Sequence, residues 1–249
     1  MPASVSPAPP TSLPPSRWRL SDLAAGLALL LLGYAVLLGV LVGVSLVLGV
    51  DPEQDTAGAL VAAVVTLLLE AWIGGAVWLV ARRRGIGGAD LGLDPPRSWL
   101  PAGYAVAGAY ASLIAYGLAV MAVERFTGAD LGALKQGNGI PDSPANTSAV
   151  WFVLGVSVMA LAPLSEEVFF RGFLFRALHG RMGLAAGLVL SALAFAAFHL
   201  NFGVVLPFFA IGLIFAWAYH VSGSLWTPIA AHAIFNTVSF VATLAGVGS

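Results

Sequence analysis

The sequence predicts an all-α membrane protein, a polytopic bundle of about seven transmembrane helices plus one amphipathic helix. Hydrophobic residues make up 59% of its 249 residues and the mean hydropathy is +0.92, whereas soluble domains contain roughly 45–50% apolar residues. Charged residues make up only 9%, and the runs between them approach the about 20 apolar residues that a helix needs to cross a bilayer. The cell membrane is therefore the expected location, and the lipid bilayer is an expected partner.

The predicted spans follow one another with short polar interruptions. Between the fourth and the fifth, the charged and amphipathic residues 165–181 are expected to continue the fourth span as a bent or interfacial helix, with Pro163 at the kink. The spans cover residues 22–50, 58–81, 99–123, 149–164, 183–200, 204–221 and 225–246.

Three regions follow from this pattern: a Pro-rich tail at 1–17, N-terminal transmembrane helices at 18–148, and a C-terminal membrane core at 149–249. Residues 1–16 contain six prolines and no charged side chain, so the tail is expected to be disordered. The first span is too long for the apolar core of a cleaved signal peptide and should remain in the membrane. Its Gly39 and Gly43 form a GxxxG motif, which we interpret as close helix packing rather than a dedicated dimer signal.

The positions of the arginines predict the orientation, because cytoplasmic loops carry the excess of Lys and Arg. When the spans alternate, one side receives nearly all of the arginines. The opposite loops hold the acidic residues 51–56 and a long stretch, 124–148, with only Arg125 and Lys135. The N-terminus is therefore predicted to be cytoplasmic. The arginines on its side are Arg17, Arg19, Arg82, Arg83, Arg84, Arg97, Arg176 and Arg181.

Charge and cysteine content exclude several classes of function. The formal net charge of -1 and the absence of a long basic run argue against a nucleic acid partner. The chain has no cysteine, which excludes disulfides, thiol catalysis and cysteine-ligated metal. Any metal ligand would have to be His, Glu, Asp or Asn.

Few ionisable residues fall at membrane depth, where an Arg or Asp costs at least about 2.5–3.5 kcal/mol on insertion scales. Such residues mark a functional site or a necessary ion pair, and most of them lie in the last hundred residues of this chain. They are Glu70, Glu166, Glu167, Arg171, His199, His220 and His232, and Asn236 follows the last histidine by four positions.

Helical spacing sorts these residues, because positions four apart share a face and adjacent positions differ by about 100°. Glu167 and Arg171 can pair, which leaves Glu166 on a neighbouring face with a carboxylate available for proton transfer. On the later spans, His199 shares a face with Phe195, and His232 shares one with Asn236. A carboxylate, two imidazoles and an amide could thus converge, a set that suits water activation and oxyanion stabilisation.

Structural roles are the alternative for each of these groups. Glu167 and Arg171 could form a structural ion pair, and each histidine could be a hydrogen-bonded core residue that bridges helices. A protonated or helix-bridging structural role is favoured for Glu70. His220 near a span end and His179 among charged residues are assigned to the interface and to solvent. Two adjacent glutamates with two membrane histidines favour a functional site over a purely structural bundle.

Three ordered motifs on successive predicted helices resemble those of a known family. The chain is similar to the CPBP membrane proteins, also called CAAX-processing or bacteriocin-processing (Abi) intramembrane proteases. The resemblance covers about residues 149–249 and implies that they form the catalytic protease core, whereas the first three spans match only as membrane helices. The motifs are E-E-x-x-x-R from Glu166 to Arg171, F-x-x-x-H from Phe195 to His199, and H-x-x-x-N from His232 to Asn236.

The resemblance implies a role for each motif residue. Glu166 with His199 would activate the attacking water. The other implied roles are organisation of the first motif's helix by Glu167 and Arg171, and polarisation of the scissile carbonyl or stabilisation of its oxyanion by His232 and Asn236.

Zinc is a candidate cofactor, because both a metalloprotease mechanism and a metal-free, glutamate-dependent mechanism have been proposed for the family. Zinc sites on one helix use H-E-x-x-H, with both imidazoles on one face. Here Phe195 and Asn236 occupy the positions four residues from the histidines. Zinc would have to be held by His199 and His232 from separate helices, with Glu166 or Glu167.

The first functional hypothesis is therefore an intramembrane endopeptidase. Its partner would be a membrane-associated protein or peptide, CAAX-type prenylated or bacteriocin-like, that enters laterally or from the cytoplasmic side. One alternative is a proton-coupled small-solute transporter that uses Glu70, Glu166 and the histidines as a relay, although no repeat symmetry supports it. Another is a non-catalytic immunity or scaffold protein of the membrane.

Overall fold

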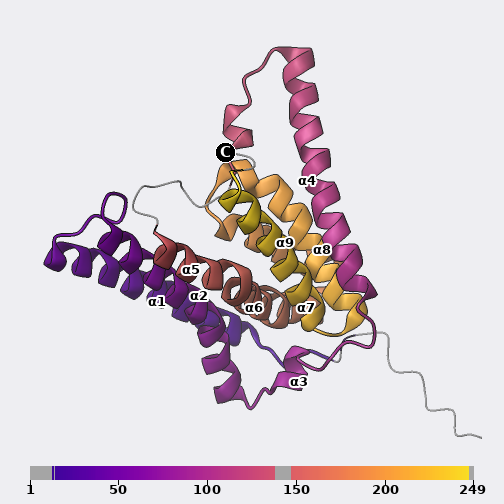
Figure 1. The fold of residues 1–249 in the computed structure, drawn as a ribbon. Coiled ribbons are helices and arrows are strands. Elements are labelled where there is room, and N and C mark those ends of the chain that lie inside the picture. Colours follow the sequence, from indigo (N-terminus) through magenta and orange to yellow (C-terminus); the bar gives the residue numbers. More distant parts are fainter. Residues whose placement is uncertain (1–12, 14, 138–146, 247–249) are drawn as a thin grey trace, which may run out of the picture.

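The structure is a helical bundle, as the sequence predicts (Figure 1). The computed structural model describes residues 13, 15–137 and 147–246, and this part of the chain contains helices and no strand. The α-helices are α1 (Leu20–Leu48), α2 (Thr56–Arg84), α3 (Gly88–Leu91), α4 (Leu100–Thr127), α5 (Ser148–Val156), α6 (Ala162–Glu167), α7 (Arg176–Phe198), α8 (Val205–Ser222) and α9 (Trp226–Leu244). Short 3₁₀ helices are η1 (Gly132–Lys135) and η4 (Phe202–Val204), and π-helical segments are η2 (Ser157–Leu161) and η3 (Val168–Phe175).

Six helical stretches of the described chain are long and apolar enough to cross a membrane. The fourth, Ser148–Phe198, contains both the fourth and the fifth predicted spans and the amphipathic helix between them. This stretch is not straight, because Gly183 has a φ of 82°. A Cβ on Gly187 would lie 3.0 Å from the Cα of His179, whereas residues eight apart in a straight helix are separated by about 12 Å. The chain therefore bends back at Gly183, so that one helical stretch supplies two predicted spans.

The bundle is built from helix pairs that share one aromatic core. Helix α8 packs between α7 and α4, α1 packs along α2, and α2 also contacts α5 and α6. Figure 1 shows that α4 extends beyond the ends of α8 and α9. The core is rich in phenylalanine from η3, α7 and α8, including Phe169, Phe170, Phe173, Phe195 and Phe215.

The start of the described chain is tied to the end of the molecule where α2 ends and α4 begins. Trp18 is buried, its Nε1 donates to the carbonyl of Gly172 at 3.0 Å, and its ring meets Phe173 edge-on. Arg17 pairs with Asp90 at 2.9 Å. Residues 1–12 and 14 of the expected tail lie outside the described residues. Trp18 thus fastens the start of α1 against η3, the segment that follows the paired glutamates, and Arg17 fastens it against α3.

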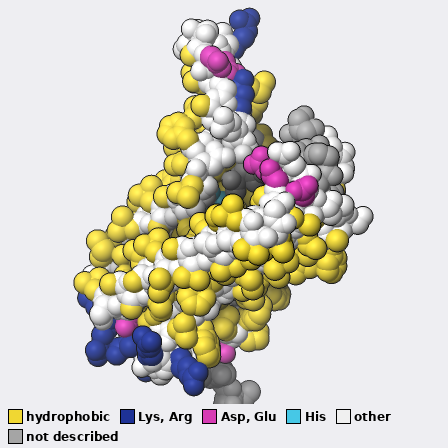
Figure 2. All heavy atoms as spheres, turned by 90° about the vertical axis from the view of Figure 1, so that its left-hand side faces the viewer, with side chains coloured by type: hydrophobic (Ala, Val, Ile, Leu, Met, Phe, Trp, Pro, Cys, Tyr) yellow, Lys and Arg dark blue, Asp and Glu magenta, His cyan; other side chains and the backbone are white. Residues whose placement is uncertain are grey.

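Most of the basic side chains gather at this same end, which is the lower end in Figure 2. Arg84 at the end of α2 pairs with the buried Asp22 at the start of α1, with 3.2 Å between Nε and Oδ2. Arg176 and Leu91 meet at Tyr219, whose hydroxyl accepts from the guanidinium and donates to the carbonyl. The arginines that the sequence assigned to one side therefore do lie at one end of the bundle, which we call the arginine-rich end.

The packing expected of Gly39 and Gly43 is absent within the described chain. A Cβ at either position would have no neighbour within 4 Å. Close approach occurs instead at Gly33, where a Cβ would overlap Nε1 of Trp72. That nitrogen donates to the carbonyl of Leu29 at 2.9 Å, so Gly33 provides the room for an indole that joins α2 to α1.

Replacement of Gly33 by alanine is expected to displace Trp72 and break its hydrogen bond to α1. Overpacking of this kind costs about 1–3 kcal/mol, so the purified Gly33→Ala protein should unfold at a lower temperature in detergent. Gly39→Ala adds the same methyl group on the same helix without a neighbouring atom and should leave the unfolding temperature unchanged. Equal effects of the two substitutions would contradict the assigned packing of α1 on α2.

Candidate active site

The two adjacent glutamates both face the interior, although they lie on different sides of their helix. They end α6, a helix of six residues between two π-helical segments. Helix α6 packs against both α2 and α9, so neighbouring positions on it meet protein on two sides. Glu166 is 6% exposed and Glu167 is 0% exposed. The sequence thus buries two carboxylates side by side, each against a different set of helices.

Glu167 is the centre of a buried ionic cluster. Its Oε1 accepts from Nη1 of Arg171 at 2.7 Å and from Nδ1 of His232 at 2.9 Å. Arg171, which is 1% exposed, also donates from Nη2 to the carbonyl of Gly212 at 3.1 Å. Three helical elements, η3, α8 and α9, are therefore held to one carboxylate and its arginine.

The guanidinium of Arg171 is enclosed by aromatic rings as well as by hydrogen bonds. Its Cζ lies 4.5 Å from the ring centroid of Phe195 and 5.5 Å from that of Phe215. A cation over an aromatic face is stabilised by the ring quadrupole, most strongly where water is excluded. This contact gives Phe195, the first residue of the F-x-x-x-H motif, a structural role beside the arginine.

His199 is fixed at the C-terminal end of α7. Its Nδ1 lies 2.9 Å from the carbonyl oxygen of Phe195. Because a carbonyl can only accept, Nδ1 must carry the proton, and Nε2 of the neutral ring keeps its lone pair. The next residue, Leu200, has a φ of 49°, a strained value for a non-glycine residue that ends the helix directly after the histidine.

Asn236 is anchored through one of its amide hydrogens. Its Nδ2 donates to the carbonyl of Val158 in η2 at 3.0 Å. Asparagine has two amide hydrogens and a carbonyl oxygen, so this bond orients the side chain and leaves further hydrogen-bonding capacity. A backbone carbonyl of the π-helical segment η2 thus helps to position Asn236.

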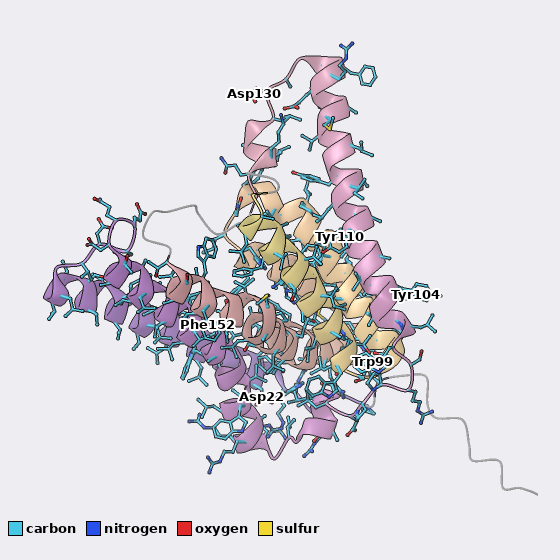
Figure 3. All side chains as sticks on the ribbon, viewed as in Figure 1. Asp22, Trp99, Tyr104, Tyr110, Asp130 and Phe152 are labelled. Carbon is cyan, nitrogen blue, oxygen red and sulfur yellow. The ribbon has the colours of Figure 1, made fainter. Side chains whose placement is uncertain are left out.

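A cavity of about 430 Å³ joins these groups. Its polar lining comes from Glu166, His199, His232 and Asn236, together with Ser239 and Glu70. The rest of the lining is apolar and includes Phe195, Phe198, Val204, Phe208, Ile211 and Phe235. On α4, Tyr110 lies toward this region (Figure 3), and its hydroxyl donates to the carbonyl of Phe235 at 3.4 Å. The volume falls within the roughly 300–1,000 Å³ of small-ligand sites.

The structure separates the predicted site residues into two groups. Glu166, His199, His232 and Asn236 reach the cavity, whereas Glu167 and Arg171 lie behind it and hold His232. The predicted pairing of Glu167 with Arg171 is present. The bond from His232 to Glu167 had no counterpart in the sequence pattern, because it joins residues 65 positions apart.

Glu70 was assigned a structural role from the sequence, yet it lines the same cavity from α2. In the sequence, Glu70 was marked only by its position in the middle of a predicted span, and that position does not indicate which way the side chain faces. His179 and His220 lie elsewhere: their rings contact each other at 5.3 Å between centroids and pack beside Phe175.

The described residues do not fit a zinc site. No group of three or more His, Asp or Glu side chains within the ranges described is arranged to hold a metal ion. The hydrogen bonds from Nδ1 of His199 to Phe195 and from Nδ1 of His232 to Glu167 leave both Nε2 atoms unbonded within the described part of the chain, so the misfit lies in the arrangement of the set and not in the two imidazoles. The expected set of His199, His232 and one glutamate is therefore not arranged to bind zinc.

Comparison with known proteins agrees with the motifs. Residues 147–238, which include all seven motif residues that reach or support the cavity, match the sequence model of a family described as "Type II CAAX prenyl endopeptidase Rce1-like". The chain is also 30% identical over 105 residues to the Bacillus subtilis protein named "Putative membrane peptidase YdiL". That match covers 40% of this chain and 43% of the relative, so the chain spans less than half of the relative's length.

No solved structure matches the chain. The sequence match and the cavity nevertheless coincide, because Glu166, His199, His232 and Asn236 all lie within 147–238. Residues 147–238 of this chain are therefore similar to the Rce1-like CAAX prenyl endopeptidases, and the predicted resemblance to the CAAX-processing membrane proteases is confirmed.

Proposed function

We propose that this protein hydrolyses a peptide bond of a membrane-associated protein within the cavity. The observation that carries the proposal is the set of Glu166, His199, His232 and Asn236 around one apolar-walled space of about 430 Å³. A buried carboxylate and an imidazole can activate water, while a second imidazole and an amide can stabilise an oxyanion. The Rce1-like match and the peptidase name of the relative support the same class of reaction.

Glu166 is the general base in this proposal, with His199 as its partner. Glu166 lines the cavity, and its Oε2 is buried with no hydrogen-bond partner among the described residues. Nε2 of His199 can accept from a water because Nδ1 is committed to Phe195. A water held between them loses a proton to Glu166, and its oxygen attacks the carbonyl carbon of the scissile bond.

His232 and Asn236 stabilise the oxyanion that forms. Nδ1 of His232 donates to Glu167, so Nε2 donates to the oxyanion when His232 is the imidazolium, whose charge the carboxylate of Glu167 balances. Asn236 keeps one amide hydrogen beyond its bond to Val158. The tetrahedral intermediate then collapses as the proton held by Glu166 passes to the leaving nitrogen, which yields a carboxylate and an amine.

The cavity opens away from the arginine-rich end. Its lining includes Gly137 after η1, Val204 in η4 and Ser239 in the second half of α9, all remote from the loop between α2 and α4. If the arginine-rich end is cytoplasmic, as the positive-inside rule indicates, the substrate enters laterally or from the opposite side. Cytoplasmic entry, which the sequence hypothesis included, is not the route we propose.

The substrate class follows from the apolar walls and the membrane location. A membrane-associated segment, such as a CAAX-type prenylated tail or a bacteriocin-like peptide, would bring the scissile bond to the depth of Glu166. The aromatic lining from Phe198, Phe208 and Phe235 suits an apolar residue of that segment.

Replacement of Glu166 by glutamine is expected to lower the rate of cleavage by at least about a hundredfold, because general-base catalysis contributes 10²–10⁴-fold. Membrane peptides from cells that express wild-type or Glu166→Gln protein are compared by mass spectrometry to identify the substrate. The purified proteins are then assayed on it. Glu124→Gln, which changes a partly exposed carboxylate paired with Lys135 outside the cavity lining, is the control that should retain activity. Full turnover by Glu166→Gln would rule out the proposed base.

Replacement of Glu167 by glutamine is expected to destabilise the fold as well as to reduce activity. It leaves Arg171 buried without its counter-charge and weakens the hold on His232, and breaking a buried ion pair costs about 3–5 kcal/mol. Thermal unfolding in detergent should therefore show a clear loss for Glu167→Gln and little for Glu166→Gln. The reverse order of stabilities would show that the roles of base and support are exchanged.

A further inference from the structure

Glu70 introduces a second carboxylate into the cavity from outside the Rce1-like region. It lies near the middle of α2, which packs against α6, and it lines the same space as Glu166. An ionisable side chain at the centre of a span is costly unless it has a partner or a function. Nothing in the proposed hydrolysis uses Glu70, because Glu166, His199, His232 and Asn236 already supply each chemical role.

The lining of the cavity brings two carboxyl side chains, those of Glu70 and Glu166, into one space. Among the described residues that line it, none is Lys or Arg. Oε2 of Glu70 and Oε2 of Glu166 are both buried and have no hydrogen-bond partner among the described residues. The nearby guanidinium of Arg171 cannot serve them, since it is bonded to Glu167 and Gly212 and stacked on Phe195.

A positively charged group of a substrate would supply what this cavity lacks. Burial of an unpaired carboxylate is unfavourable, and a charge-assisted hydrogen bond from an ammonium or guanidinium removes that penalty. We propose that Glu70 is a specificity-determining residue that binds a cationic group beside the scissile bond, an inference that rests on the proposed peptidase function. The group is a lysine or arginine side chain, or a free N-terminal amine, of the peptide substrate.

The charges around the open end of the cavity point to the same class of substrate. The loop between α1 and α2 carries Asp51, Glu53 and Asp55, and acidic side chains border the hollowed face in Figure 2. The charges of the segment from α4 to η1, across the hollow, sum to zero. Glu124 pairs with Lys135 at 2.7 Å, and the remaining charges are one arginine and Asp130. Asp130 lies on the projecting segment after α4 (Figure 3). A negative rim raises the local concentration of cationic ligands.

The test uses the full-length protein in lipid nanodiscs and a set of hydrophobic ten-residue peptides that differ at one position. That position carries Lys, Leu or Glu. Its distance from the cleavage site identified in membranes is varied stepwise from one peptide to the next. Both kcat/KM and binding to the inactive Glu166→Gln protein are measured. The variants are Glu70→Gln and Glu70→Lys, with Asp90→Asn at the arginine-rich end as the control for loss of a carboxylate.

The wild-type protein should prefer the Lys peptide to the Leu peptide by about ten- to hundredfold, as expected for a hydrogen bond to a charged group. Glu70→Gln should reduce this ratio to near one, Glu70→Lys should favour the Glu peptide, and Asp90→Asn should keep the wild-type ratio. Higher salt should lower kcat/KM for the Lys peptide more than for the Leu peptide.

If Glu70→Gln leaves the ratio of kcat/KM for the Lys and Leu peptides unchanged, the proposal is overturned. This includes the case in which kcat/KM falls equally for both peptides, which would indicate that Glu70 acts on Glu166 or on the fold. The binding measurement separates this failure from failure of the proposed function. If Lys peptides bind preferentially through Glu70 but no peptide is cleaved, the charge preference holds and the peptidase proposal fails.

Discussion

One carboxylate, that of Glu167, determines how the site is assembled. It accepts from Arg171 and from His232 through the same oxygen, and Arg171 reaches on to α8 and to the ring of Phe195 on α7. A buried ion pair of this kind is a poor source of net stability but a strong constraint on geometry, since removal of one partner leaves the other unpaired. The consequence is that η3, α7, α8 and α9 cannot shift independently around the cavity.

This constraint explains why two glutamates are adjacent in a chain in which only 9% of the residues are charged. Glu167 is bonded through Oε1 to the arginine and the histidine and does not line the cavity, whereas Glu166 lines the cavity and has no such partner at its buried Oε2. Each carboxylate would be a poor substitute for the other. The support needs two fixed hydrogen-bond donors, whereas a base needs a free oxygen beside water.

The sequence predicted the parts of the site that depend on local geometry. Helical spacing indicated the pair of Glu167 and Arg171, and the motifs identified both histidines and Asn236. It could not predict that His232 bonds to Glu167, or that Glu70 reaches the cavity, because both depend on packing between distant helices. For the same reason Gly39 and Gly43 were misjudged: small residues permit close packing, but only the neighbouring helix decides where it occurs. The helical fold followed from hydropathy, while the bend at Gly183 that joins two predicted spans depended on a single backbone angle.

The central claim is that water held by Glu166 and His199 attacks the peptide bond directly, without a covalent enzyme intermediate. The most direct test is hydrolysis of the identified substrate peptide by the purified protein in ¹⁸O-labelled water that contains hydroxylamine. Direct attack predicts one ¹⁸O atom in the new carboxylate and no hydroxamate product. Formation of a hydroxamate would reveal an acyl-enzyme and contradict the role assigned to Glu166.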